Sequence, residues 1–136
     1  MGKYIANPTI TVNGVDLSDH ARAVEINQSA ADVDTTCMGE TGVTRMQGLR
    51  DESFVVTWAQ DFAASKVDAT LNALYTAGTA HTVVVKATSA AVSATNPKWT
   101  ATCVLLDYNP IAGSPGDLTE APTTFKVSGI IVRAEA

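Results

Sequence analysis

Apolar and polar residues alternate at every second position in several short stretches, which is the period of a β-strand with one covered face. We predict strands at residues 9–12, 15–17, 22–28, 53–62, 99–108 and 123–133. Asn13 and Gly14 separate the first two stretches, and an Asn-Gly pair favours a type I′ hairpin turn because both residues tolerate a positive φ. A further strand is expected over residues 82–88, where three successive valines make both faces apolar.

The stretch from Ser53 to Phe62 has the clearest core pattern, with Phe54, Val56, Trp58 and Phe62 on one face. In the last stretch, Phe125, Val127 and Ile131 share a face with Gly129, so a bulge or a close backbone approach is expected at the glycine. The core residues that we predict from these stretches and from the helix described next are Phe54, Val56, Trp58, Leu71, Leu74 and Phe125.

One segment has the helical period instead. Val67, Leu71, Leu74 and Tyr75 lie at spacings of four, three and one, which form a single apolar stripe on a helix. Ser65 and Asp68 fit a capping box, and Gly78 is placed to end the helix. We therefore predict a helix over residues 65–77, packed on the sheet by its stripe.

These elements predict one domain over residues 1–136 of mainly β class, a β-sandwich or barrel with one flanking helix and a long loop between early strands. Residues 1–8 would form a short N-terminal arm. Residues 109–122 hold three of the five prolines and are expected to be a surface connection.

The long loop, expected over residues 36–51, combines three kinds of residue. Gly39, Gly42 and Gly48 interrupt regular structure, whereas an ordinary solvated loop has little use for large apolar side chains. The loop nevertheless carries Met38, Met46 and Leu49, with the charged Glu40, Arg45 and Arg50 among them. This mixture predicts either a contact surface for another copy of the chain or a loop folded back over its own core.

Composition narrows the function classes. Charged residues make up 17% of the chain, below the usual quarter, so much of the surface could be covered in an assembly. A net charge of −5 argues against tight binding to a phosphate backbone. No stretch has the length and hydrophobicity of a membrane helix, and the N-terminus lacks the apolar region of a signal peptide, so we expect a protein made in the cytoplasm. For Cys37 and Cys103, two buried or semi-buried reduced thiols are favoured over a disulfide.

Candidate catalytic and metal-binding residues form no recognisable pattern. His20 and His81 are interpreted as surface or capping histidines, because neither has a Cys, Asp or Ser pattern nearby that names a role. Asp32 and Asp34 share a strand face and could pair as carboxylates or bind a cation, although solvated acids are favoured. Trp58 is expected in the core, as is Trp99. We predict no enzymatic activity, no metal and no cofactor.

Four acids remain open to two interpretations. If they line the inner wall of a ring, like-charge repulsion would keep a polyanion from adhering while it slides past. Otherwise they form a solubility face. The residues concerned are Glu25, Asp32, Asp34 and Asp61.

The order of short motifs resembles one family. After the opening hairpin come Val-Asp-Thr-Thr, Gly-x-Thr-Gly-x-x-x-x-x-Gly-Leu, Phe-x-Val-x-Trp, Asp-Phe-Ala-Ala-Ser-Lys-Val-Asp-Ala-Thr-Leu, the stretch from Ala87 to Pro97 and the ending Thr124 to Gly129. In this order they look like the major tail tube proteins of long-tailed, non-contractile bacteriophages. The resemblance covers nearly the whole chain.

The resemblance implies a structural virion protein that self-assembles into rings, usually hexameric, of β-sandwich subunits whose strands join into an inner barrel. Stacked rings would form the tail tube through which DNA leaves without specific binding. The implied partners are further copies of the chain, a tape measure protein, a tail terminator and a distal tail protein, with no membrane. The implied contacts between copies lie in the terminal arms and in the long loop, at Met38, Glu40, Arg45, Met46, Leu49 and Arg50.

Two other functions stay open at this stage. A monomeric β-sandwich could serve as a ligand-binding or adhesin module, which would need exposed aromatic residues on one face. A small hydrolase could use His20 or His81.

Overall fold

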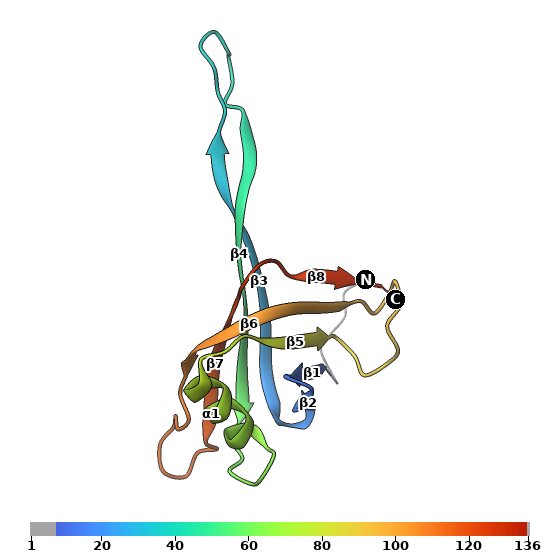
Figure 1. Ribbon diagram of the computed structural model, residues 1–136, viewed down its shortest axis with the longest axis vertical. Coiled ribbons are helices and arrows are strands. Elements are labelled where there is room, and N and C mark those ends of the chain that lie inside the picture. The colour runs from blue at the N-terminus through green and yellow to red at the C-terminus, as the bar shows by residue number, and fades with distance from the viewer. Residues whose placement is uncertain (1–7, 136) are drawn as a thin grey trace.

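A computed structural model describes residues 8–135 and shows a mainly β protein with one helix (Figure 1). The expected class is therefore confirmed, whereas the N-terminal arm predicted over residues 1–8 lies, apart from Pro8, outside the described residues. The elements are β1 (Thr9–Val12), β2 (Val15–Asp16), a 3-10 turn (Ser18–His20), β3 (Ala21–Asp34), β4 (Arg45–Ala59), α1 (Val67–Ala77), β5 (His81–Lys86), β6 (Lys98–Tyr108), β7 (Glu120–Val127) and β8 (Val132–Ala134).

The strands belong to one sheet in the order β2-β1-β5-β6-β7-β4-β3, with β8 paired to β6, and all pairs are antiparallel. The sheet curls over its apolar face. Val24 and Ile26 of β3 line the same pocket as Val85 of β5 and Trp99 of β6, although two strands separate β3 from β6 in the sheet. The sequence predicted a β-sandwich or a barrel, and the observed sheet is closer to an open barrel.

The core fills the space inside this curl. Phe54, Trp58 and Phe125 are fully buried there, and α1 covers the sheet with Val67, Leu71 and Leu74. All six predicted core residues are confirmed. Phe62 was wrongly placed with them: its exposed fraction is 61%, because β4 ends at Ala59 and the alternation no longer applies beyond it.

The helix begins two residues later than expected. Lys66 is its N-cap and makes no side-chain capping bond, while Ser65 has a φ of 60°, so the predicted capping box is wrong. Asp68 instead accepts a hydrogen bond from the Tyr108 hydroxyl at 2.8 Å, which ties the first turn to β6. Gly78 ends the helix as predicted, with a φ of 65° and its amide donating to the Leu74 carbonyl at 3.0 Å.

The largest correction concerns the loop expected over residues 36–51. Residues 45–51 belong to β4 and pair with the end of β3, so regular strand structure stops only at Asp34 and resumes at Arg45. Thr35 and Thr44 extend the pairing through a 2.9 Å backbone hydrogen bond. The glycines misled the prediction because a single glycine inside a strand marks a bulge as readily as a loop.

The chain ends also differ in detail. The expected strand over residues 123–133 is two strands, β7 and β8, separated by a bend in which Gly129 has a φ of 114°. Among the described residues, a Cβ atom at Gly129 would meet no atom beyond the adjacent residues within 4 Å, so the backbone conformation and not a close approach favours glycine. The opening hairpin is confirmed, with positive φ at both Asn13 and Gly14. The connection after β6 is shorter than expected, because β7 already begins at Glu120.

Both cysteines were expected to be buried or semi-buried thiols. Cys103 is buried, but Cys37 is exposed. Within residues 8–135, no helix has the length and apolar character needed to span a membrane.

Candidate assembly interface

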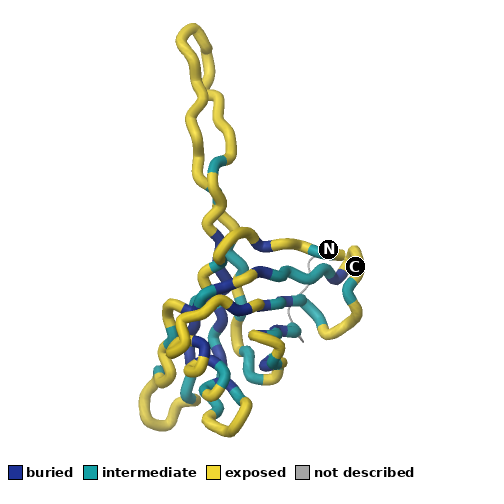
Figure 2. Tube along the Cα trace, viewed as in Figure 1, coloured by how far each residue is buried: buried dark blue, intermediate teal, exposed yellow. Residues whose placement is uncertain are grey.

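A two-stranded hairpin projects from the body of the molecule (Figure 1). Pairing between β4 and β7 stops at Ser53, which faces Lys126, so β4 has only β3 as a neighbour from Glu52 outward. We call residues 29–51 the projecting hairpin. Figure 2 shows that it is exposed over almost its entire length.

The apolar residues of the projecting hairpin lack cover. The exposed fraction is 103% for Met38, 89% for Leu49 and 58% for Met46, and Val33 and Val43 are also exposed. Three of the six predicted contact residues are thus large apolar side chains in solvent. Sequence reasoning missed Val33 and Val43, because both were read as parts of a strand or loop and not as members of the apolar set.

Gly48 lies at a register shift in this hairpin. Ala30 faces Arg50 but Asp32 faces Gln47, so β4 contains one extra residue between the two pairs, which is a β-bulge. A Cβ atom at Gly48 would lie 2.9 Å from Val33 Cγ2 and 3.3 Å from the Ala31 carbonyl oxygen. The bulge therefore packs closely enough to require glycine.

The charged residues of the hairpin are largely paired within it. Arg45 forms an ion pair with Asp32, and the Thr44 hydroxyl donates to the Glu40 carboxylate at 3.1 Å. Asp34 accepts the backbone N–H of Thr36 at 2.9 Å, and hydrogen bonds from Thr36 lower the pKa of Asp34. These pairs rigidify the ladder and leave the apolar side chains as its unpartnered groups.

Glu52 lies where the hairpin leaves the body, and its carboxylate is buried. Its Oε2 accepts hydrogen bonds from Arg50 Nη2 at 2.8 Å and Gln28 Nε2 at 3.2 Å, while Oε1 accepts the backbone N–H of Ile131 at 2.8 Å. Burial favours the protonated form, but the three donors outweigh it and lower the pKa of Glu52. Arg50, predicted as a contact between copies, thus has a partner inside its own chain.

Sequence reasoning missed Glu52, although a signal was present. The residue has the same parity as Phe54, Val56 and Trp58 in β4, so the alternation places its side chain on the covered face. A carboxylate at such a position needs charged or polar partners.

The four acids considered for a ring's inner wall are not brought together. Glu25 pairs with Val55 on the face opposite to the core, whereas Asp32 is occupied by Arg45 and Asp34 by Thr36. Asp61 lies beyond the end of β4, where it accepts the Ala63 N–H at 2.9 Å and contacts His20. Whether any of them faces a bore stays a prediction, but they do not form one wall within a subunit.

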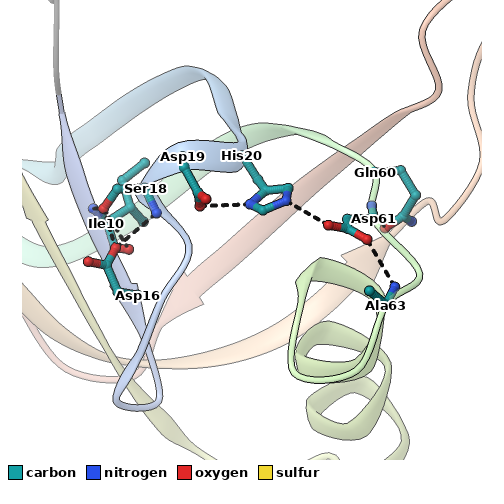
Figure 3. A network of polar contacts seen from close by, with 8 residues as sticks. All are labelled: Ile10, Asp16, Ser18, Asp19, His20, Gln60, Asp61 and Ala63. Atoms are coloured by element: carbon teal, nitrogen blue, oxygen red, sulfur yellow. Dashed lines mark hydrogen bonds and ion pairs between the residues drawn. The ribbon is translucent and has the colours of Figure 1, made fainter.

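His20 connects two segments that are far apart in the chain (Figure 3). Its Nδ1 lies 2.7 Å from Asp19 Oδ1, and its Nε2 lies 2.9 Å from Asp61 Oδ2. Burial favours the neutral ring, but hydrogen bonds to Asp61 and Asp19 prevail and raise the pKa of His20. The His20 ring joins the turn before β3 to the segment before α1, a structural role that the sequence did not reveal.

His81 was interpreted as a surface or capping histidine, and for this residue the interpretation is wrong. Its exposed fraction is 5%, and its ring packs edge-on against Phe125 with centroids 5.6 Å apart. Burial lowers the pKa of His81, which favours the neutral ring in the core. It starts β5 with the alternation of a covered strand, which is the signal that could have placed it.

The sheet has one open face. Leu105, Phe125, Phe54 and Ile26 form a row across four strands on the covered face, and the next row outward is Val104, Lys126, Ser53 and Asn27. Hydroxyl-bearing and β-branched residues dominate the open face, which includes Thr82, Thr100, Thr102, Thr124, Val55 and Thr57. Charged side chains of both signs lie among them, at Glu25, Lys86, Lys98, Glu120 and Lys126.

Among residues 8–135, no group of three or more His, Cys, Asp or Glu side chains is placed to hold a metal ion. The geometry instead describes a contact surface: a two-stranded hairpin with exposed apolar groups, anchored to the body at a buried carboxylate.

Comparison with solved structures identifies the fold. The chain superimposes on a subunit of the virion of a native gene transfer agent particle with a TM-score of 0.77 and 15% identity, covering 98% of this chain and 99% of that one. A subunit of the tail of an empty gene transfer agent particle with C6 symmetry gives 0.72 and 15%, covering 97% of each chain. A subunit of the sheath–tube complex of an extracellular contractile injection system, PVC, gives 0.73 and 9%, covering 99% and 93%.

The chain therefore has the tail-tube fold over its whole described length, as the sequence resemblance implied. No protein-family model matches the sequence, and no curated protein matches it.

Proposed function

We propose that this chain is the structural subunit of a tail tube, assembling into rings that stack into a conduit. The observation that carries the proposal is a fold shared end to end with subunits of tail and sheath–tube particles, combined with a projecting hairpin that one chain leaves uncovered.

The hairpin supports assembly on physical grounds. An isolated two-stranded ladder is only marginally stable in water, because it has no third strand or helix against which to bury side chains. Met38, Met46 and Leu49 are more than half exposed, and exposed apolar side chains gathered on one element mark an interaction site. In the assembled tube, a neighbouring copy covers these residues.

The sheet edges support ring closure. Among residues 8–135, β3 is an edge strand of 14 residues that pairs with β4 alone, so its outer row of N–H and C=O groups could pair with another chain. A head-to-tail contact between different surfaces of identical chains closes into a ring when the rotation permits. Six copies per ring are favoured by the C6 symmetry of one structural neighbour.

The open face of the sheet is the better candidate for the bore. The opposite face is filled by the core and α1, so only the open face is available to water inside a ring. Hydroxyl-bearing residues make up much of this face, and its three lysines are accompanied by Glu25 and Glu120. This mixture suits a wall past which DNA moves without specific binding, since tight binding to phosphate needs an excess of clustered Lys and Arg. Of the four acids, Glu25 is the one on this face.

Finer partners follow from the same proposal. A tube needs proteins that fill it, end it and join it to the tail tip, which in a phage are the tape measure, terminator and distal tail proteins. The tube would be part of a virion, with its subunits made in the bacterial cytoplasm.

The proposal is tested by negative-stain electron microscopy of the purified chain over a range of concentrations. Wild-type protein should form rings or tubes about as wide as those of the structural neighbours. The double variant Met46→Asp, Leu49→Asp should remain a folded monomer by circular dichroism and light scattering, because the charges oppose burial of the hairpin against a neighbour.

Tyr75→Asp is the control, since it places a single Asp at an exposed apolar residue of α1, away from the hairpin. This variant should assemble normally. Normal tubes from the double hairpin variant would contradict the role given to the hairpin, and a wild-type chain that stays monomeric at every concentration would overturn the tube function.

The monomeric module has less support. Such a module presents aromatic side chains together on one surface, but Trp58 is fully buried, Trp99 is partly buried against the core, and the exposed Phe62 and Tyr75 lie on a loop and a helix.

A further inference from the structure

Glu52 joins three parts of the molecule that are otherwise separate in the chain. Arg50 precedes it in β4, Gln28 lies directly across the ladder in β3, and Ile131 follows the bend between β7 and β8. The side chain of Glu52 is completely buried, and all three partners donate to its carboxylate.

The position of Glu52 gives these bonds a mechanical consequence. Ser53 is the last residue of β4 that pairs with β7, so Glu52 is the first residue of β4 supported by β3 alone. Backbone pairing to the rest of the sheet cannot fix the angle at which the hairpin leaves the body. The bond from the Ile131 amide is a direct link across this junction, and Ile131 is itself anchored in the core.

The energetics favour a stiff junction. Hydrogen bonds to a charged group are about twice as strong as neutral ones, and a buried carboxylate that loses a donor pays the full desolvation cost. Displacing the bend before β8, or tilting the hairpin, would separate the carboxylate from one of its donors. The hydrogen bonds to the Glu52 carboxylate therefore oppose both movements.

We propose that Glu52 is a positioning residue that fixes the direction of the projecting hairpin relative to the body and couples this direction to the position of β8. The hairpin can then reach the neighbouring copy at one angle, which lowers the entropy lost on assembly. The role in assembly rests on the proposed tube function, but the geometric role does not.

The experiment measures the direction of the hairpin in monomers. Cys37 is an exposed native thiol near the hairpin tip, whereas burial raises the pKa of Cys103 to about 12, so a spin label attaches selectively to Cys37. A second label goes on Asn72→Cys, an exposed position of α1. Double electron–electron resonance then reports the distribution of distances between hairpin and body.

In the Glu52→Gln variant the amide can still accept the Ile131 N–H, but its NH₂ group then faces the donors of Arg50 and Gln28. We expect the distance distribution to become about twice as broad, and the protein concentration needed for tube formation to rise about tenfold, the scale of one lost charged hydrogen bond. The amide of Ile131 should also exchange faster with deuterium.

Asp32→Asn is the matched control. It removes the carboxylate of another ion pair of this hairpin, with Arg45, which lies beyond the junction in the ladder of β3 and β4. Its distance distribution should match the wild type. If Glu52→Gln does not fold, Arg50→Gln serves instead, because it keeps the carboxylate and removes its charged donor, with a smaller broadening expected.

Two outcomes overturn the inference: an unchanged distance distribution in Glu52→Gln, or the same broadening in Asp32→Asn. Because distances are measured on monomers, they test the positioning role even where the wild-type chain makes no tubes. A wild-type chain that makes no tubes would therefore count against the proposed function alone.

Discussion

The body and the projecting hairpin are two regions of one sheet that are stabilised in different ways. In the body, Phe54, Trp58 and Phe125 are fully buried in a core that α1 covers. In the hairpin, Leu49 and Met38 are almost fully exposed, and the strands are held by their ladder and by pairs such as Asp32 with Arg45. The body buries its large apolar side chains within a single chain, whereas the projecting hairpin leaves them exposed.

Strand β4 belongs to both regions and makes the contrast sharp. Its residues from Glu52 to Ala59 are mostly buried or partly buried, whereas those from Arg45 to Arg50 are mostly exposed. The change occurs where β7 stops pairing with β4. A strand's stability thus depends on its neighbours more than on its own residues, and the hairpin's missing neighbour is the strongest sign of assembly.

Replacing a large apolar side chain with alanine should change the free energy of unfolding very differently in the two regions. Phe125→Ala should lower the free energy of unfolding by about 3–5 kcal/mol, because it leaves a cavity in the core. Leu49→Ala should change the stability of the monomer by less than about 0.5 kcal/mol, since the side chain is in solvent. Chemical denaturation of both variants checks this contrast, and a large loss from Leu49→Ala would show that the hairpin packs on its own body.

A smaller effect is expected at the bulge. Gly48→Ala should destabilise the hairpin by about 1–2 kcal/mol, because the new methyl group crowds Val33 and the Ala31 carbonyl. Hydrogen exchange should show faster exchange for hairpin amides and unchanged exchange in the core. Gly42→Ala is the control, as no atom lies near that position. Equal effects of the two substitutions would contradict the close packing inferred at Gly48.

The pH dependence of the body is expected to contain a contribution from His20. The folded state raises the pKa of His20 above its ordinary value of 6.5, so the stabilisation is fully present below pH 6.5 and is lost as the pH rises through the folded pKa. The melting temperature of wild type should exceed that of His20→Gln most at pH 5.5 and least at alkaline pH. A difference that grows with pH would contradict the ion pairs with Asp19 and Asp61.

The smallest effect should come from the exposed ion pair of the hairpin. Arg45→Gln should cost the monomer about 0–1 kcal/mol, because both partners are more than half exposed and solvent screens their attraction. Thermal melts at low and high salt would show whether that small cost disappears with screening. A loss as large as that of Phe125→Ala would mean that the hairpin is stabilised like the body.

The sequence by itself determined which residues share a face. Period-2 alternation in β4 identified Phe54, Val56 and Trp58 as one kind of position, and the helical stripe identified Leu71 and Leu74. Asn13-Gly14 and Gly78 marked a turn and a helix end correctly, because a positive φ is a local requirement that a few residue types meet.

Only the tertiary structure decided whether a face or an edge is covered, because that depends on strands distant in the chain. The end of β7 leaves the hairpin without a third strand, so a segment expected to be a loop extends as an exposed ladder. Glu52 and Ile131 are 79 residues apart and His20 and Asp61 are 41 apart, and no local pattern encodes such partners. Alternation is a property of neighbours in sequence, whereas burial is a property of neighbours in space.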